Sequence, residues 1–209
     1  MKKFYERYWD GTPAELADFK YKWPVLSPFI PKHTCRILDY GCGKGKILSE
    51  IRSMNPHASL YGADISAIAR KAAKISVPNS TIVAIDSNQS THLSSHSFDF
   101  MLSLDVIEHI YDTEKVFIEF NRLLKKGGIL LLSTPYNGPI KNIIISIIGF
   151  DIVFDPISPH IRFYTKKSLE RLLQKYGFSV TKFGYYGRLP FVWRGMFALA
   201  RKTNDIMAG

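Results

Sequence analysis

The first segment of chemical interest is DYGCGKG, Asp39 to Gly45, which places three alternate glycines after a carboxylate. An apolar run precedes it and a helical pattern follows it, so it is expected to turn from a strand into a helix. Glycines at such a turn let a ligand approach the backbone, and the helix N-terminus adds partial positive charge. A dinucleotide-binding turn needs its third glycine at position 46, which is Lys46 here. The segment therefore predicts a ligand-binding turn of a different pattern, with a purely structural tight turn as the alternative.

Two further carboxylates, Asp64 and Asp86, end the next two apolar runs of the sequence. The carboxyl ends of parallel strands share one edge of an open α/β sheet, where ligands bind. A carboxylate at position 64 can accept hydrogen bonds from both hydroxyls of a ribose, and one at position 86 can face an exocyclic amine. Each acid alone is equally compatible with a helix cap or a loop residue. The prediction of a shared ligand site therefore depends on their common edge with Asp39.

The segment DVIEHI, which begins at Asp105, brings two carboxylates and an imidazole close together in the sequence. These groups suit a divalent cation, with Asp105, Glu108 and His109 as weak candidate ligands. The alternative is that Leu104 to Val106 line a ligand through their backbone while His109 faces the pocket as a general base. We expect the second arrangement and no metal.

Two other reactive side chains, His160 and Cys42, have less specific surroundings in the sequence. His160 follows an irregular stretch and precedes Thr165, so it is a candidate catalytic residue near the pocket, with capping or packing as the alternative. Cys42 is expected to fill space in the glycine turn. Cys35 and Cys42 flank a predicted buried strand, which makes a disulfide between them unfavourable. A reducing cytoplasm is therefore the expected environment.

From Arg36 onward, apolar strand-like runs alternate with helical periodicity, which predicts βαβ units and a mostly parallel sheet. Ser66 and Thr165 are expected to cap helices, and Gly127 and Gly128 to end one. The predicted strands are residues 35–40, 59–64, 80–86, 98–104, 128–135, 178–187 and 195–202.

Residues 1–34 are expected to form an N-terminal helical cap, followed by one globular unit at 35–209. Residues 136–159 break the alternation and predict a functional insertion or lid after the fifth strand. Their apolar run, Ile143 to Phe154, is shorter than the roughly 20 residues that span a membrane. The run is expected to pack in the fold, or to touch lipid and form the substrate entrance with residues 185–194. Lys20 and Lys22 of the cap are expected to be solvated, with binding of a carboxylate or phosphate as the alternative.

The composition places the chain among globular proteins. Its 209 residues are 46% hydrophobic, 22% charged and 13% aromatic, which excludes disorder as the overall state. With 28 basic and 18 acidic residues the formal net charge is +10, so phosphate, nucleic acid or acidic lipid is favoured as a partner. The N-terminal residues contain no apolar run of the signal-peptide type. A cytoplasmic protein with peripheral contact to an anionic membrane is the expectation.

From about Tyr5 to Lys202 the chain resembles the class I S-adenosylmethionine-dependent methyltransferases, especially the ubiquinone-pathway enzymes and the type 11 and 12 groups. Four features occur in the family's order, namely LDYGCGKG, the acids at 64 and 86, and SLDVIEHI. The resemblance implies S-adenosylmethionine as the cofactor. It also implies a Rossmann-like α/β fold, a doubly wound, mostly parallel seven-stranded sheet whose last strand, here GMFALARK, is antiparallel.

The resemblance further assigns roles to individual residues. The glycine turn is expected to surround the methionine part of the cofactor, Asp64 to hold the ribose, and Asp86 to lie beside the adenine. In ubiquinone-pathway O-methyltransferases an E-x-x-E-H pattern binds metal, but this chain has Asp105 in place of the first glutamate. The expected cofactor-binding residues are Asp39, Tyr40, Gly41, Cys42, Gly43, Gly45, Asp64, Ile65, Asp86, Ser87, Leu104, Asp105 and Val106.

Taken together, these features predict S-adenosylmethionine-dependent methylation of a small-molecule or lipid-linked acceptor, by O-methylation. Such transfer is an in-line displacement, so the protein supplies alignment and, where needed, one base. The alternative is a nucleic-acid-associated or non-catalytic module that binds S-adenosylmethionine. The N-P-P-Y motif of amino-group nucleic-acid methylases is absent after the fourth predicted strand, where DVIE stands, so nucleic acid is disfavoured as a partner.

Overall fold

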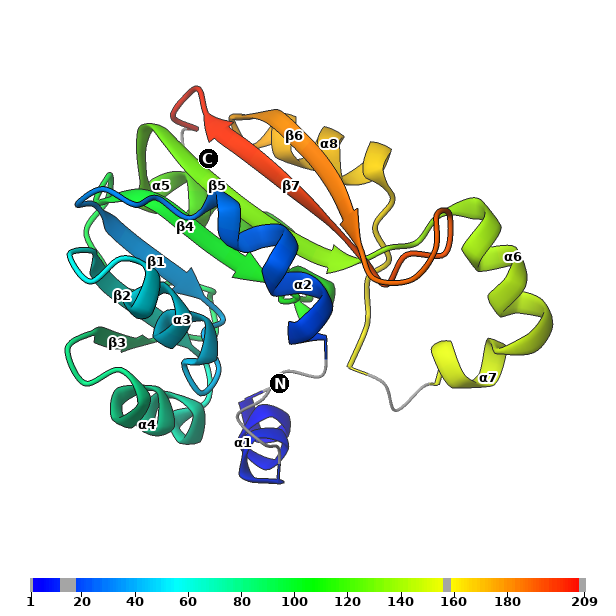
Figure 1. Ribbon diagram of the computed structural model, residues 1–209, viewed down its shortest axis with the longest axis horizontal. Helices are drawn as coiled ribbons and strands as arrows, with labels where there is room; N and C mark the ends of the chain where they lie inside the picture. Colours follow the sequence, from blue (N-terminus) through cyan, green and yellow to red (C-terminus); the bar gives the residue numbers. More distant parts are fainter. Residues whose placement is uncertain (1, 12–17, 156–158, 207–209) are drawn as a thin grey trace.

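The computed structural model describes residues 2–11, 18–155 and 159–206, and its centre is a seven-stranded sheet (Figure 1). The strands lie in the order β3-β2-β1-β4-β5-β7-β6. Strand β7 is antiparallel to both of its neighbours, and the other pairings are parallel, so the predicted fold class is confirmed. The strands are β1 Arg36–Tyr40, β2 Ser59–Asp64, β3 Thr81–Ala84, β4 Phe98–Leu104, β5 Leu124–Pro135, β6 Phe178–Tyr186 and β7 Gly195–Lys202.

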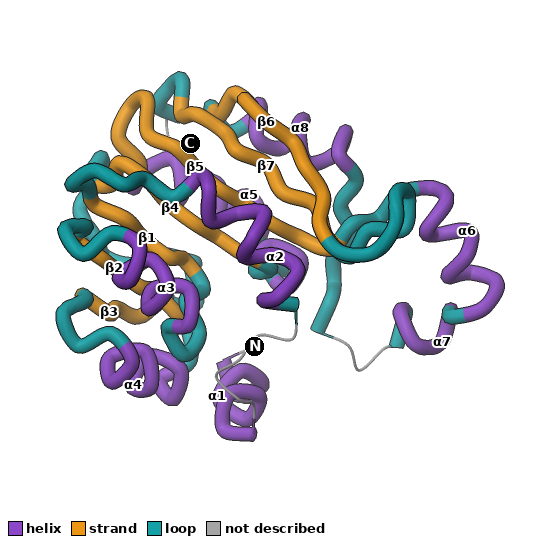
Figure 2. Tube along the Cα trace, in the orientation of Figure 1, coloured by secondary structure: helices purple, strands orange, loops and turns teal. Residues whose placement is uncertain are grey.

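Helices cover both faces of this sheet (Figure 2). On one face lie α2 (Phe19–Leu26), the short 3₁₀ helix η1 (Ser27–Phe29), α3 (Lys46–Met54) and α4 (Ala67–Ser76). Their apolar residues, among them Trp23, Leu48 and Ala73, pack against side chains of the strands such as Ile37 and Phe100. The sheet is therefore buried on this side by the first half of the chain.

The second face is covered by α5 (Thr113–Leu123) and α8 (Lys166–Lys175). Phe117 and Phe120 of α5 and Leu169 of α8 pack with Leu38 and Tyr40, which alternate along β1 with the residues of the other face. Burial on both sides explains why the strands read as nearly continuous apolar runs in the sequence.

Local capping signals set several helix boundaries. Ser66 caps α4, because its side chain accepts a hydrogen bond from the Ala69 amide, and Thr165 caps α8 in a reciprocal capping box. The prediction that Gly127 and Gly128 end a helix is wrong. Helix α5 already ends at Leu123, because Leu124 is fully buried and pairs with Phe98 at the start of β5; the two glycines lie where the register shifts.

Two parts of the fold lie outside these layers. Helix α1 (Lys2–Gly11) precedes α2, and the predicted insertion forms α6 (Pro139–Ile148) and α7 (Phe150–Val153), which stand apart from the sheet beyond β5 (Figure 1). Positions 1 and 12–17 of the predicted cap and 156–158 of the insertion lie outside the described residues. No helix in the described part of the chain is long and apolar enough to cross a membrane.

Gly45 lies at the start of α3, where this helix packs closely against α4. Its φ of +84° is in the left-handed region, and a Cβ atom at this position would lie 3.0 Å from the Ala73 Cα of α4. Both the backbone conformation and the close approach of α4 therefore require glycine here.

We predict that Gly45→Ala lowers the free energy of unfolding by about 1–3 kcal/mol, because alanine in this conformation is strained and its Cβ meets backbone rather than a flexible side chain. Urea unfolding is the measurement, with Gly11→Ala as the control, since a Cβ there meets nothing within 4 Å. Equal stability of the two variants would contradict the assignment.

Candidate active site

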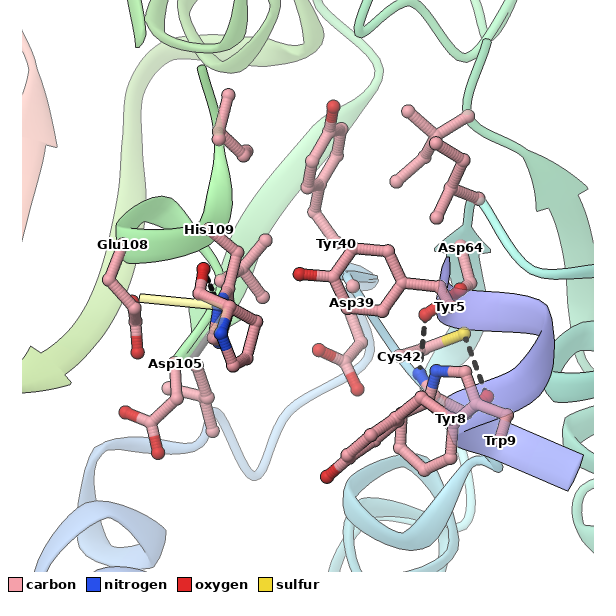
Figure 3. A pocket seen from close by; sticks show the side chains of 18 of the residues that line it. Tyr5, Tyr8, Trp9, Asp39, Tyr40, Cys42, Asp64, Asp105, Glu108 and His109 are labelled. Atoms are coloured by element: carbon pink, nitrogen blue, oxygen red, sulfur yellow. Dashed lines mark hydrogen bonds between the residues drawn. The ribbon is translucent and has the colours of Figure 1, made fainter. Parts of the chain in front are cut away.

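A cavity of about 390 Å³ opens at the edge of the sheet where the parallel strands end (Figure 3). Its lining comes from α1 and α2, the glycine turn after β1, the ends of β2, β4 and β5, and the segment around η2 (Ile107–His109). Of the predicted site residues it brings together Asp39, Tyr40, Gly41, Cys42, Gly43, Asp64, Ile65, Leu104, Asp105, Val106, Glu108, His109 and His160.

The glycine turn forms one end of the cavity together with Asp64. This buried carboxylate accepts hydrogen bonds from the amides of Gly43 and Ser66, each 2.9 Å long. Burial raises the pKa of Asp64, although these two hydrogen bonds oppose the shift. A Cβ at Gly43 would lie 2.6 Å from the indole of Trp9, so glycine lets the α1 aromatic ring cover the turn.

Asp39 lies beside this turn and is 2% exposed. Burial, reinforced by the nearby charge of Asp64, raises its pKa to about 7. Its Oδ2 atom is buried without a hydrogen-bond partner in the described part of the chain. A buried acceptor of this kind indicates a site that takes a donor from a ligand. The thiol of Cys42 is buried and its pKa is raised by burial, which fits the predicted filling role rather than a nucleophile.

Helix α1 is held over this end of the cavity by Glu6. The Glu6 carboxylate accepts hydrogen bonds from the Ser66 hydroxyl and from the Ala67 and Ile68 amides, at the N-terminus of α4. The aromatic residues Phe4, Tyr5, Tyr8 and Trp9 of α1 thereby line the cavity. The sequence shows aromatic clustering here but not the contact of Glu6, because 60 residues separate it from Ser66.

An ion pair between Lys22 of α2 and Asp105 forms another wall of the cavity. The expectation that Lys22 is solvated is wrong, since it is 3% exposed. Asp105, whose φ is +54°, also accepts hydrogen bonds from the hydroxyls of Ser133 (2.8 Å) and Tyr186 (3.1 Å). Burial opposes ionisation of Asp105, but the ammonium group of Lys22 and these hydrogen bonds outweigh it and lower the pKa.

At the opposite end of the cavity from Asp64 lie His109 and Glu108 (Figure 3). The His109 Nδ1 atom is 3.0 Å from the carbonyl oxygen of Pro159, which can only accept, so Nδ1 carries the proton and Nε2 the lone pair. Burial lowers the pKa of His109, with the charge of His160 acting in the same direction and the Pro159 contact opposing it. The imidazole is therefore neutral at pH 7.

Ligand atoms of Glu108, His109 and His160 lie within 4.8 Å of one another, a spacing that a metal ion can bridge. The set expected from the sequence differs, because the carboxylate of Asp105 is directed to Lys22, Ser133 and Tyr186 instead. Glu108 is buried, and burial together with the charge of Asp105 raises its pKa well above the usual range. Its Oε2 atom accepts a hydrogen bond from the Thr134 hydroxyl, whereas Oε1 is buried without a partner among the described residues.

Three predicted cofactor residues lie outside the cavity lining of the described chain, Gly45, Asp86 and Ser87. Gly45 packs against α4, and Ser87 is exposed. The Oδ1 atom of Asp86 accepts hydrogen bonds from the amides of Asn88 and Ser90, so this carboxylate organises its own loop. The same loop contributes Ile85 and Gln89 to the cavity, and Gln89 accepts a hydrogen bond from the Tyr40 hydroxyl through its backbone oxygen.

The family model for a methyltransferase domain matches residues 1–182 of this chain. The chain belongs to this methyltransferase family. A ubiquinone biosynthesis O-methyltransferase from Rhodopseudomonas palustris is 30% identical over 211 residues, which cover 87% of this chain and 79% of that protein. A relative of the same name from Cereibacter sphaeroides is 30% identical over 160 residues, 73% of this chain and 63% of the relative. The match thus spans less than two thirds of that relative's length.

A solved structure confirms the fold of this methyltransferase chain. An S-adenosylmethionine-dependent methyltransferase from Mesorhizobium loti superimposes with a TM-score of 0.69 at 19% sequence identity. The alignment covers 92% of this chain and 99% of that one. The overall fold of this chain is therefore that of the solved methyltransferase.

We predict that Lys22→Met lowers the free energy of unfolding by about 2–4 kcal/mol at pH 7, because it leaves the Asp105 carboxylate without its ammonium partner. A lowered folded-state pKa of Asp105 contributes stability above about pH 4, and this contribution is lost as the pH falls through the folded pKa. The difference between variant and wild type should therefore shrink below about pH 4. Denaturant unfolding at several pH values tests this, with Lys20→Met, an exposed position of the same helix, as the control. A cost that is independent of pH would contradict it.

Proposed function

We propose that this methyltransferase transfers a methyl group from S-adenosylmethionine to a hydroxyl oxygen of a small-molecule or lipid-linked acceptor. The observation that carries the proposal is the distribution of groups in the cavity. Carboxylates and the glycine turn lie at one end and a neutral imidazole with a fixed tautomer lies at the other. The relatives named for ubiquinone biosynthesis support an oxygen acceptor, and they favour an enzyme over a nucleic-acid-associated module.

The acidic end of the cavity fits the cofactor. Asp64 already orders Gly43 and Ser66, and its remaining lone pairs suit ribose hydroxyls. The buried Oδ2 of Asp39, which lacks a partner in the described chain, suits the ammonium group of the methionine part. The aromatic side chains of α1 would cover the cofactor and exclude water from it.

His109 is the proposed general base. Its Nε2 lone pair would accept the proton of the acceptor hydroxyl as the oxygen attacks, and the Pro159 carbonyl would stabilise the resulting imidazolium through Nδ1. When bound, S-adenosylmethionine would supply the methyl group on a sulfonium sulfur, and the electron pair of the broken S–CH₃ bond would return to sulfur as the acceptor oxygen forms the O–CH₃ bond. Tyr5, whose ring contacts that of His109 edge to face, would hold the imidazole in place.

We expect Asp64→Asn to weaken the binding of S-adenosylhomocysteine by about 1.5–3 kcal/mol, the usual value for a hydrogen bond to a charged group. Isothermal titration calorimetry on the full chain is the measurement. Asp205→Asn is the matched control, because this carboxylate is exposed and lies outside the cavity lining, and the variant should bind normally. The cofactor assignment fails if the two variants have equal affinities or if Asp64→Asn binds like the wild type.

For His109→Gln we expect turnover to fall by about 10²–10⁴-fold, the usual contribution of a general base, with S-adenosylhomocysteine binding unchanged. Transfer of a tritiated methyl group into a quinol-containing lipid extract measures turnover. Excess chelator separates this role from metal binding. Because the Asp105 carboxylate is directed to Lys22, Ser133 and Tyr186 and is not available as a metal ligand, we expect full activity in chelator. Loss of activity in chelator with rescue by magnesium would refute the metal-free mechanism.

We further propose that α6 and α7 contact the surface of an anionic membrane. Their apolar residues are exposed, including Ile147 at 76%, Ile148 at 78% and Phe150 at 55%, and exposed apolar area of this kind is unfavourable in water. Positive side chains lie close by, among them Lys141 on α6 and Arg188 on the β6–β7 connection. An apolar helix beside basic residues is the pattern of an interfacial anchor.

Wild-type protein is therefore expected to float with phosphatidylglycerol vesicles at low salt and less at physiological salt. The double variant Ile147→Gln/Ile148→Gln should lose flotation, because it removes the apolar contact without touching the core. Ile75→Gln on α4, also 73% exposed, is the control and should float normally. Equal flotation of all three proteins would contradict the proposal.

A further inference from the structure

A second cavity of about 410 Å³ adjoins the first, between the end of β5, helix α6 and the connection from β6 to β7. The two cavities share Asp18, Pro135 and His160, so a single molecule can extend from one to the other. The remaining residues that line the second cavity are Asn137, Lys141, Ile145, Val153, Arg162, Phe163, Arg188 and Arg194.

Positive side chains predominate in the lining of the second cavity, whereas carboxylates predominate in the first. Lys141, Arg162, Arg188 and Arg194 line it, against one carboxylate, Asp18, among the described residues. Arg194 donates to Asp18 through Nη1 at 2.6 Å, so these two charges compensate each other. Lys141, Arg162 and Arg188 remain as three positive charges around the cavity. A doubly negative group would offset most of this charge.

The surrounding structure holds these cations together in spite of their repulsion. Lys141 donates to the carbonyl of Tyr136 at 2.7 Å, and burial with the charges of Arg188 and Arg194 lowers its pKa to about 8. Arg162 is fixed by hydrogen bonds to the carbonyls of Ile110 and Tyr111. Crowding of like charges costs free energy, and such a cost is usual where an anion is bound.

The backbone conformation of Arg188 indicates that the fold imposes the position of this cation. Its φ of +62° is in the left-handed region, which a residue with a long side chain rarely adopts. It follows Gly187, also left-handed, in the turn after β6, and the amide of Arg194 donates to the carbonyls of both Tyr186 and Gly187. Strained positions of this kind concentrate at ligand sites, where the fold enforces them.

We propose that the second cavity binds a phosphate-class oxyanion carried by the same acceptor whose hydroxyl is methylated in the first cavity. This inference rests on the proposed function and names its substrate class. Guanidinium groups bind phosphate oxygens in bidentate geometry, and a lysine adds a point charge. His160 lines both cavities and therefore lies between the proposed phosphate site and His109. The centroids of the two imidazole rings are 4.8 Å apart. The acceptor is thus an amphiphile, with a phosphate beside the apolar surface of α6.

Calorimetry on the full chain saturated with S-adenosylhomocysteine tests this with geranyl phosphate and its uncharged counterpart geraniol. We expect geranyl phosphate to bind at least about tenfold more tightly, a difference that falls as salt is added. In Lys141→Gln/Arg188→Gln this preference should disappear. Lys71→Gln/Lys167→Gln, which removes the same charge from exposed positions outside both cavities, should retain it.

The outcomes separate the two proposals. If wild type fails to bind S-adenosylhomocysteine, the proposed function itself fails. If that ligand binds but geranyl phosphate shows no preference over geraniol, or the Lys141/Arg188 variant retains the preference, this inference alone is overturned. A charge dependence seen with phosphatidylglycerol vesicles but absent with geranyl phosphate would also overturn it, because the anion would then be a membrane headgroup rather than part of the acceptor. Unchanged S-adenosylhomocysteine affinity of the variants shows that they are folded.

Discussion

The contact between Lys22 and Asp105 is the interaction on which the arrangement of the site depends. It joins α2, from the N-terminal part of the chain, to the end of β4, and Ser133 and Tyr186 extend it to β5 and β6. Four segments far apart in the sequence are thereby fixed at one edge of the sheet. Because the Lys22 ammonium is buried and is costly without its partner, this contact ties α2 to the end of β4. The cavity walls are consequently positioned by electrostatics as well as by packing.

Much of the fold can be predicted from local sequence. The strands could be placed because both of their faces are buried, which produces continuous apolar runs, and Ser66 and Thr165 could be identified as caps because capping depends on the next three residues. The end of α5 could not be predicted from local sequence, because the pairing of Leu124 with Phe98 ends the helix before Gly127 is reached. Tertiary pairing decides that boundary, and no local signal encodes it.

The site shows the same division. The glycine turn, Asp64 and the DVIEHI segment were identified from type and position, and the structure brings them to one cavity. Lys22 and Glu6 carry no such signal, because lysine and glutamate are usually solvated and their partners lie 83 and 60 residues away. Asp86 and Asp64 look alike in the sequence, since each ends an apolar run. Their loops differ, and this determines which carboxylate reaches the cavity.

The hydrogen bond between His109 and the Pro159 carbonyl joins two parts of the chain that lie 50 positions apart in the sequence. His109 belongs to the segment after β4, whereas Pro159 lies at the far end of the insertion that carries α6 and α7. The proton on Nδ1, and with it the lone pair on Nε2, is held in place by a backbone carbonyl that the insertion supplies. The backbone of the insertion thereby takes part in orienting the proposed general base. A change in the path of the insertion would therefore reach the imidazole through this one backbone carbonyl, although α6 and α7 themselves stand apart from the sheet (Figure 1).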